Sequence, residues 1–514
     1  MPPHDDERLK VANAVYASLA IENTLNPVQA RSFVRCLQTS WQVPVIRWGG
    51  EESNKQLDDA RRLITSAVIF QQIEGPSSLK ASLCYRRAAE LLEWLSRAAD
   101  PLRLTAPVEL FAAGAYQLGG LPAMASGLLD QVELNDKGSR LYARFFKADF
   151  DGVLHLVRLF WQQNPELTDR DAPKRLLDED GPEKISWYIT VELVRCLGLI
   201  ADSLRRGDHE RFSRALAKLE ALDALAVRTF SDDASMLITL LCSVANGFSD
   251  SSIYKPILQL ANLNPSRTFR LQAFARGQFS RGRGILWPSQ RHGLARLLRT
   301  SSFALCTPTG SGKTLVATIA LIKELLIPEY EGLAPLALYL VPSRALAGEV
   351  EHKLSSELGQ DLIITGLYGG VDWGLTDYWL TANRPTVLIA TVEKADALMR
   401  YLGSVLFARL RLLIIDEAHQ VVPEDNENTQ NLFADHSSRS LRLEGLVSRL
   451  LTQSPDIVKI ALTAVAGGAA TPIARWIEKL PDAEAVGIRV TSHVKLGEFS
   501  RPILDGTIGF VPSC

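Results

Sequence analysis

Residues 1–262 carry apolar side chains at spacings of three and four positions, which predicts a series of amphipathic helices. Glycine and proline residues interrupt the pattern and divide it into segments. The predicted helices cover residues 58–73, 78–98, 108–129, 152–162, 184–204, 210–225 and 233–245. We therefore expect a helical N-terminal domain over residues 1–262. The segments show no fixed period, so an irregular bundle and a repeat-like array of helix pairs both stay open.

From residue 302 onward, short runs of consecutive apolar residues alternate with amphipathic stretches. The runs predict strands at residues 303–306, 336–341, 362–367, 386–390, 412–415, 457–462 and 485–490. The stretches between them predict helices that begin near Lys313, Ser343, Lys394, Leu441 and Thr471. Strands that are apolar at every position are typical of a parallel sheet covered by helices on both faces. We therefore expect an α/β domain over residues 263–490.

The composition narrows the class of protein. Of 514 residues, 46% are hydrophobic and 22% are charged, as in globular chains that contain roughly 100–200 residues per domain. The six cysteines include no Cys-x-x-Cys pair, which argues against a zinc site or a disulfide framework. The first ten residues are acidic and polar, and no apolar run approaches the length of about 18–20 residues that spans a bilayer. We expect a cytoplasmic protein with no membrane partner.

The charge distribution is uneven along the chain. The net charge of −2 gives no overall attraction to nucleic acid, so any basic binding surface must be local. Residues 264–299 contain eight arginines and no acidic residue. A run of like charge is usually a solvated face. Because this run directly precedes a candidate phosphate-binding motif, contact with a polyanion is the other interpretation.

A glycine-rich turn lies between the first predicted strand of the α/β domain and the helix that follows. It reads Thr307-Pro308-Thr309-Gly310-Ser311-Gly312-Lys313-Thr314, with a threonine where the general phosphate-binding pattern has its first glycine. In such a turn the backbone N–H groups of Thr309 to Gly312 cradle phosphates, helped by the helix N-terminus. Lys313 would hold the β- and γ-phosphates of a nucleotide, and the Thr314 hydroxyl would bind Mg²⁺. A glycine turn that ends a strand by chance is the plainer alternative.

Two carboxylates follow the buried strand predicted at residues 412–415. Asp416 and Glu417 begin the sequence Asp416-Glu417-Ala418-His419. Asp416 is placed to hold Mg²⁺ through water, and Glu417 to orient and deprotonate the water that attacks a γ-phosphate. Such a tetrapeptide alone is often only a helix start with acids in its first turn. Its position after an apolar strand, downstream of the glycine-rich turn, favours catalysis.

Together these motifs resemble the DEAD/DEAH-box ATPases of helicase superfamily two, above all the branch of Ski-like and archaeal repair helicases. The similar stretch covers residues 279–504, and its motifs follow the family's order. The resemblance implies a RecA-like domain, the cofactors ATP and Mg²⁺, and work in DNA repair or defence. It also makes Leu286-Trp287-Pro288-Ser289-Gln290 an adenine-recognising motif, in which the Gln290 amide would hydrogen-bond the adenine edge.

The resemblance further implies contacts to a single strand of DNA or RNA. Segments similar to the family's backbone-gripping motifs place such contacts at Arg344, Gly369, Gly370, Thr391 and Lys394. Phosphate contacts need donors, positive charge and bare backbone but no reading of bases, and these residues suit that role. Each segment taken alone could equally be a turn or a helix cap. Their order, and their positions after predicted strands, favour nucleic-acid contact.

One motif departs from the family pattern. Where the family has Ser-Ala-Thr after an apolar strand, this chain has Thr463-Ala464-Val465, so the hydroxyl of the third position is absent. In the family this motif couples hydrolysis to strand movement. We therefore expect Thr463 and Ala464 to serve coupling, and we expect unwinding to be affected more than ATP binding.

The family also uses a second RecA-like domain, whose arginine stabilises the transferring phosphoryl group. Residues 491–514 resemble the lead-in to that domain, which a longer chain or a separate polypeptide would supply. The leading hypothesis is an ATP-dependent helicase or translocase, here the front half of the motor and weakly active alone. The alternative is an ATP-dependent switch or scaffold that recruits a protein partner through the helical domain. A nucleotide kinase is disfavoured by Asp416-Glu417 and by Gly369-Gly370.

Overall fold

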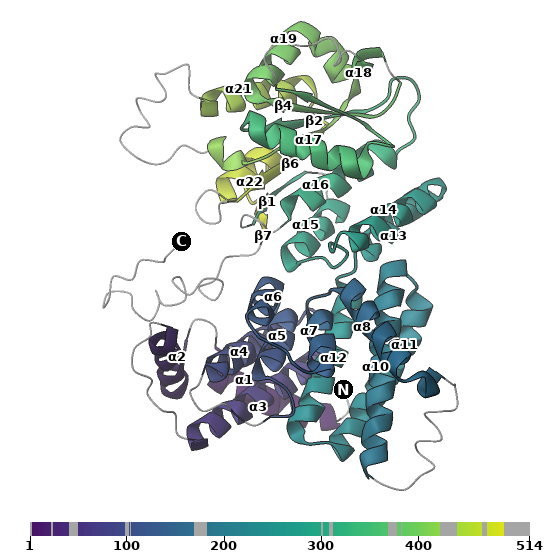
Figure 1. The fold of residues 1–514 in the computed structure, drawn as a ribbon. Coiled ribbons are helices and arrows are strands. Elements are labelled where there is room, and N and C mark those ends of the chain that lie inside the picture. The colour runs from purple at the N-terminus through teal and green to yellow at the C-terminus, as the bar shows by residue number, and fades with distance from the viewer. Residues whose placement is uncertain are drawn as a thin grey trace. The chain divides into compact units, whose positions relative to one another are not determined.

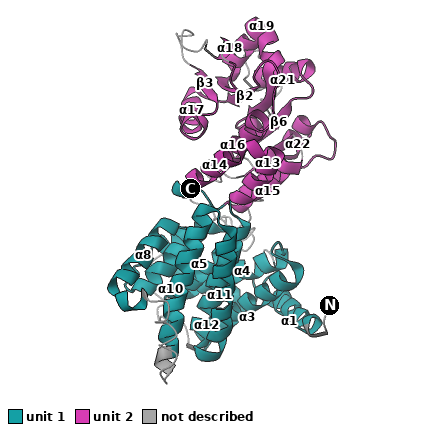
Figure 2. Cartoon of the chain, turned by 90° about the vertical axis from the view of Figure 1, so that its right-hand side faces the viewer, with its two compact units in different colours: residues 1–252, 279–285, 492–514 teal, residues 253–278, 286–491 magenta. Residues whose placement is uncertain are grey.

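The chain is represented by a computed structural model and divides into two compact units (Figures 1 and 2). One unit contains residues 1–252 and 279–285, and the other contains residues 253–278 and 286–491. The structure describes residues 3–21, 24–40, 50–97, 102, 104–168, 182–299, 302–307, 312–368, 378–381, 383–421, 439–464 and 470–487. The lead-in expected at residues 491–514 lies outside these ranges.

Within its described residues the first unit consists of helices and their connections, with one isolated β-bridge between Ser252 and Ile285, which confirms the fold class expected for the N-terminal half. Its helices are α1 (Pro3–Leu19), α2 (Pro27–Ser40), α3 (Gly50–Glu74), α4 (Leu79–Ser96), α5 (Val108–Leu118), α6 (Pro122–Asp130), α7 (Lys137–Phe146), α8 (Phe150–Gln163), η1 (Pro165–Thr168), α10 (Pro182–Arg206), α11 (His209–Thr229) and α12 (Asp232–Asp250). From α3 onward, described α-helices that follow one another in sequence pack together; α1 packs on α3, α2 packs on α4, and α12 returns to pack on α5. The helix–turn–helix pattern of residues 109–129, with its break at Gly119-Gly120, is confirmed as α5 and α6: the chain turns at Gly119 and at Gly120, whose φ is +79°.

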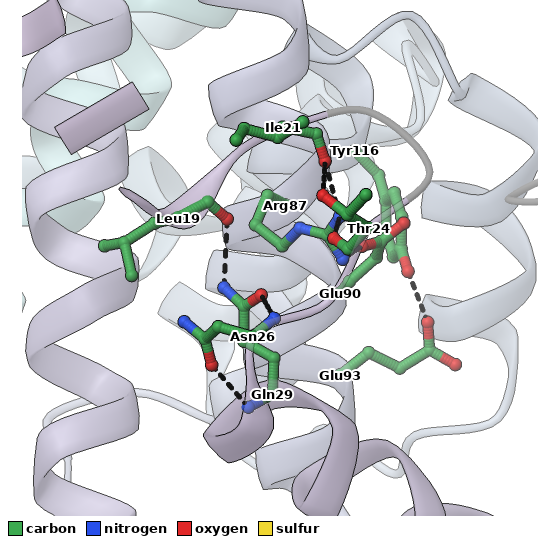
Figure 3. A network of polar contacts seen from close by, with 9 residues as sticks. All are labelled: Leu19, Ile21, Thr24, Asn26, Gln29, Arg87, Glu90, Glu93 and Tyr116. Atoms are coloured by element: carbon green, nitrogen blue, oxygen red, sulfur yellow. Dashed lines mark hydrogen bonds and ion pairs between the residues drawn. The ribbon is translucent and has the colours of Figure 1, made fainter. Parts of the chain in front are cut away.

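A buried ion pair on α4 connects this helix to the segment between α1 and α2 (Figure 3). Arg87 and Glu90 on α4 are 3% and 6% exposed, and their side chains lie 2.8 Å apart. The Arg87 guanidinium also donates to the backbone carbonyls of Ile21 and Thr24, at 3.3 and 2.8 Å. One buried guanidinium thus neutralises a buried carboxylate and satisfies two carbonyls of the connection between α1 and α2, as buried charge requires.

The second unit contains a seven-stranded sheet with the strand order β3-β4-β2-β5-β6-β1-β7 (Figure 1). All neighbouring strands pair in parallel, which confirms the predicted sheet. Every residue of β1, β2, β4 and β6 is buried, as expected for strands covered on both faces. The strands are β1 (Phe303–Cys306), β2 (Leu336–Val341), β3 (Ile363–Leu367), β4 (Thr386–Thr391), β5 (Leu410–Ile415), β6 (Val458–Thr463) and β7 (Val486–Gly487).

Helices cover the sheet. Buried residues of α19, α21 and α22 form one hydrophobic cluster with side chains from the strands, while α17 packs on β2, β3 and β4. Right-handed crossover connections place α16 and α17 on the opposite face from α19. The helical elements of this unit are α13 (Tyr254–Leu263), η2 (Pro265–Arg267), α14 (Thr268–Ser280), α15 (Pro288–Arg299), α16 (Lys313–Leu321), η3 (Ile322–Leu326), α17 (Arg344–Leu358), α18 (Tyr378–Thr381), α19 (Val392–Arg409), η4 (Ala418–Val421), α21 (Arg439–Gln453) and α22 (Ala470–Glu478).

The described part of the chain bears on the expectations about cysteines and about membrane-spanning segments. Its five cysteines are buried, free thiols at positions 36, 84, 196, 242 and 306. Across the same ranges, no helix combines the length and the apolar character needed to cross a membrane.

Candidate functional site

The strand order divides the candidate residues into two groups along one edge of the sheet. Because all strands are parallel, their carboxyl ends meet at the same edge. The adjacent strands β5, β6 and β1 lead into the segments with Asp416, Thr463 and Lys313. The adjacent strands β3, β4 and β2 lead into those with Gly369-Gly370, Thr391 and Arg344. The fold therefore places the candidate nucleotide-binding residues and the candidate nucleic-acid contacts on two neighbouring halves of one edge.

The glycine-rich turn leaves β1 and enters α16. Residues 308–311, which include Thr309, Gly310 and Ser311, lie outside the described ranges. Gly312 precedes the first residue of α16 with φ at +79°, a left-handed conformation that favours glycine. Lys313 follows as the first helical residue, with a side chain only 11% exposed. Thr314 lies in the same first turn, where the helix dipole favours anions.

Gln290 in the first turn of α15 connects two of the predicted nucleotide-binding segments. Its Oε1 accepts from the backbone N–H of Trp287 at 2.9 Å, and its Nε2 donates to the carbonyl of Gly312 at 3.4 Å. A Cβ atom at Gly312 would lie 2.0 Å from Gln290 Nε2. The absence of a side chain at Gly312 therefore lets the Gln290 amide reach the end of the glycine-rich turn.

The two carboxylates lie opposite Lys313. Asp416 extends the end of β5, because its N–H donates to the carbonyl of Leu340 at 2.9 Å. Glu417 has φ at +50°, which is strained for a residue other than glycine and is typical of functional positions. Its Oε1 lies 3.9 Å from Lys313 Nζ. Within the described residues, this buried Nζ has no hydrogen-bond partner.

Burial controls the chemistry of Asp416. Burial and then the neighbouring Glu417 charge raise the pKa of Asp416, whereas the N–H of Glu417, Lys313 and the hydroxyl of Tyr339 oppose the rise. Tyr339 lies on β2 with no exposed surface, and its hydroxyl donates to Asp416 Oδ2 at 3.3 Å. Burial and the carboxylates raise the pKa of Tyr339 well above its ordinary value, so it stays a donor. Sequence reasoning missed Tyr339, because one tyrosine in an apolar strand looks like core.

His419 connects the segment Asp416-Glu417-Ala418-His419, called the DEAH segment here, to the end of β6. Its Nδ1 lies 3.2 Å from Thr463 Oγ1 and 3.2 Å from Glu417 Oε2. Thr463 is fully buried, and its carbonyl accepts from the N–H of Thr307 at the start of the glycine-rich turn, at 3.1 Å. Ala464 follows directly after β6. Sequence reasoning quoted His419 within its motif but gave it no role.

Lys313, Thr314 and Asp416 fit a nucleoside triphosphate with Mg²⁺. A buried ammonium without a hydrogen-bond partner among the described residues suits a polyanion. Asp416 supplies a hard oxygen ligand, and a buried carboxylate whose pKa is raised gains most from a nearby cation. Lys313 and Thr314 lie on the opposite side in the first turn of α16. The described residues contain no group of three or more His, Cys, Asp or Glu side chains that could hold a metal ion.

The candidate nucleic-acid contacts lie at the ends of β3, β4 and β2, which we call the strand half of the sheet edge. These residues differ in their exposure. Arg344 is exposed in the first turn of α17, where the Ser343 hydroxyl accepts from the N–H of Leu346 at 3.2 Å. Thr391 ends β4 and is only 6% exposed, and Lys394 is half-buried in the first turn of α19. Gly369 and Gly370 lie outside the described residues.

Two members of the arginine run have acidic partners. Arg270 on α14 donates to both carboxylate oxygens of Asp361 at 2.8 and 2.9 Å. Arg296 on α15 contacts Glu478, whose side chain is 4% exposed, at 2.6 Å. At these two positions the run therefore ties helices to the sheet domain.

Comparison with known proteins matches this region to one family. Residues 287–464 match the family model for DEAD/DEAH box helicases. The chain is 32% identical over 201 residues to the ATP-dependent DNA helicase Hel308 of Pyrococcus horikoshii, which covers 38% of this chain and 24% of Hel308. These findings confirm the family resemblance.

Two further similarities extend the comparison. The chain is 26% identical over 425 residues to the Hachiman protein HamB of Bacillus cereus, covering 82% of this chain and 35% of HamB. The chain therefore spans a minor part of the length of either curated relative. A structure of the Mycobacterium smegmatis helicase Lhr, bound to ssDNA and AMP-PNP, matches 42% of this chain and 27% of Lhr at 22% identity, with a TM-score of 0.32.

Proposed function

We propose that this chain, whose residues 287–464 match the DEAD/DEAH box helicase family, couples ATP hydrolysis to movement along single-stranded nucleic acid. The observation that supports this most is the division of one sheet edge between nucleotide motifs on β5, β6 and β1 and backbone-gripping motifs on β3, β4 and β2. Hel308 is named an ATP-dependent DNA helicase, so we propose single-stranded DNA as the first substrate to test.

In the proposed mechanism Lys313 Nζ binds β- and γ-phosphate oxygens of ATP, which gives this buried ammonium the hydrogen-bond partners that the described residues do not supply. Thr314 and Asp416 would hold Mg²⁺, which when bound neutralises charge on these phosphates. Glu417 orients the attacking water and accepts its proton. Tyr339 holds the Asp416 carboxylate, and Gln290 holds the adenine-recognising segment next to Gly312.

We propose that the contact between His419 and Thr463 couples hydrolysis to the strand. Thr463 lies between the glycine-rich turn, through Thr307, and the DEAH segment, through His419. A catalytic arginine on a second RecA-like domain, in a longer chain or a partner chain, would complete the site. Such an arginine contributes about 10³–10⁵ in rate in related NTPases, so we expect slow turnover without it.

The test is ATP turnover of the purified chain, with and without single-stranded DNA or RNA, beside Glu417→Gln. The motor requires turnover that the strand stimulates and that Glu417→Gln abolishes. Tight ATP binding with negligible turnover would support half of a composite site. ATP binding and turnover indifferent to any strand would contradict the motor. It would favour the switch, in which the helical unit recruits a protein partner and ATP changes only the conformation.

A further inference from the structure

The end of β3 is tied to α17 through one carboxylate. Glu351 on α17 accepts from the N–H of Gly366 through Oε1 at 3.0 Å, and from the hydroxyl of Tyr368 through Oε2 at 2.5 Å. Gly366 lies within β3, and Tyr368 is the first residue after Leu367, its last. The hydrogen bond to Glu351, followed by burial, raises the pKa of Tyr368 to about 12, so the phenol stays a donor at physiological pH.

Two glycines make room for this contact. A Cβ atom at Gly366 would lie 2.1 Å from Tyr368 Cε1 and 2.5 Å from Glu351 Oε2, closer than the atoms can approach. A Cβ at Gly348, one turn before Glu351 on α17, would lie 3.5 Å from the Tyr368 hydroxyl, which is ordinary contact distance. The pair therefore fits tightly on the β3 side and more loosely on the α17 side.

The position of the pair connects it to the proposed strand contacts. Arg344 and Glu351 are seven residues apart on α17 and share one face of the helix, two turns from each other. Tyr368 directly precedes Gly369-Gly370 in sequence. A carboxylate this close to a site for phosphates repels the ligand electrostatically, so its benefit must come from its contacts rather than from its charge.

We propose that Glu351 and Tyr368 form a positioning clamp that holds the end of β3 against the Arg344 helix and so sets the affinity for a single strand. The clamp rests on the proposed function, because it acts on the strand half of the sheet edge. Neither residue contacts the phosphates. They hold the end of β3, up to Tyr368, on α17, as supporting contacts around binding residues do elsewhere.

The experiment measures single-strand DNA affinity and ATP affinity of the full chain, using a fluorescent oligonucleotide and a fluorescent ATP analogue. Tyr368→Phe and Glu351→Ala should each weaken binding of the oligonucleotide about fivefold to tenfold, which is about 1–1.4 kcal/mol and lies within the net contribution of one typical hydrogen bond. Both should leave ATP affinity unchanged. Glu351→Gln should retain most of the affinity, because its amide can accept from Gly366 and donate to the tyrosine oxygen.

Matched variants distinguish the effect of the clamp on strand affinity from the effect of removing a negative charge and from general disruption of the fold. Glu349→Ala removes the same charge from the same helix, and charge alone predicts that this variant and Glu351→Ala both bind more tightly. The clamp predicts opposite directions for the two. Gly366→Ala should weaken strand binding, whereas Gly348→Ala should not. The double variant Glu351→Ala/Tyr368→Phe should bind no more weakly than Glu351→Ala alone, since both changes remove the same bond.

The outcomes distinguish this inference from the function on which it rests. If Tyr368→Phe and Glu351→Ala bind the strand like the wild type while Arg344→Ala weakens binding, the clamp is wrong and the motor proposal stands. Equal losses of strand and ATP affinity would also overturn the clamp, because they indicate a general structural role. If the wild-type chain binds no single strand, the proposed function fails and the clamp fails with it.

Discussion

The hydroxyl of Tyr339 donates to Oδ2 of Asp416 at 3.3 Å, across the boundary between β2 and β5. This boundary is where the strand half of the sheet edge meets the nucleotide half. The bond is fully buried on the tyrosine side and holds the carboxylate that we propose for Mg²⁺. Through this hydrogen bond Tyr339, on a strand of one half of the edge, contacts Asp416, a central residue of the other half.

Tyr339→Phe should raise the Mg²⁺ concentration needed for half-maximal ATP turnover by about tenfold, because partners of metal ligands typically contribute 10–100-fold to metal affinity or activity. The maximal rate at saturating Mg²⁺ should change much less. The measurement is a Mg²⁺ titration of turnover, together with Mg²⁺-dependent binding of a fluorescent ATP analogue. Tyr142→Phe is the control, since it removes the hydroxyl of a half-buried tyrosine in the helical unit. An unchanged Mg²⁺ midpoint would contradict the assigned role.

Asp416→Asn should abolish ATP turnover, yet it should stabilise the nucleotide-free chain against unfolding. Because the pKa of Asp416 is raised by burial, the folded state binds the proton more tightly than the unfolded state. Stability is therefore lost as the pH rises from the ordinary carboxyl range through the folded pKa, and Asn does not incur this cost. We expect a higher melting temperature for Asp416→Asn near pH 7.5, with a gain that shrinks as the pH falls.

Asp233→Asn is the control of opposite sign. Burial alone would raise the pKa of Asp233, but hydrogen bonds from Ser231 and from the backbone and hydroxyl of Thr105 lower it to about 2. Its stabilising effect is present above the ordinary carboxyl pKa and is lost as the pH falls toward 2, so this variant should destabilise the chain at neutral pH. Thermal melts from pH 5 to 8 test both. A destabilised Asp416→Asn would show that its burial carries no such cost.

Gly312→Ala should reduce ATP affinity at least about tenfold, since a Cβ would displace the Gln290 amide as well as strain the left-handed backbone. Gly332→Ala isolates the strain, because Gly332 has φ at +90° and nothing lies within 4 Å of its added Cβ. Each variant should lose roughly 1–2 kcal/mol of stability. Only Gly312→Ala should lose affinity for a fluorescent ATP analogue. Wild-type affinity in that variant would remove Gln290 and Gly312 from the nucleotide site.

The sequence predicted the sheet well, because β1, β2, β4 and β6 are buried at every position and appear as continuous apolar runs. It predicted Lys313 and the DEAH carboxylates from local motifs. It could not reveal contacts that arise only from strand order. Tyr339 reaches Asp416 over 77 positions, and Tyr368 reaches Glu351 over 17, because β2 lies beside β5 and α17 packs on β3. The break at Gly119-Gly120 was visible in the sequence, and the structure has the turn between α5 and α6 there.

The Arg87 network offers a test of the helical unit on its own. Arg87→Met removes the charge that neutralises the buried Glu90 and leaves the carbonyls of Ile21 and Thr24 without this donor. Breaking a buried pair in this way costs about 3–5 kcal/mol. Arg97→Met is the control, because the Arg97–Glu93 pair is partly exposed and such pairs contribute about 0–1 kcal/mol.

Urea unfolding followed by circular dichroism measures the loss of stability in both variants, while binding of a fluorescent ATP analogue reports on the sheet unit. All nine residues drawn in Figure 3 belong to the helical unit. Arg87→Met should therefore destabilise that unit far more than Arg97→Met and leave ATP affinity unchanged in both. Similar unfolding midpoints for the two variants would mean that the guanidinium of Arg87 is replaceable by water. A parallel loss of ATP affinity would mean that the two units do not fold independently.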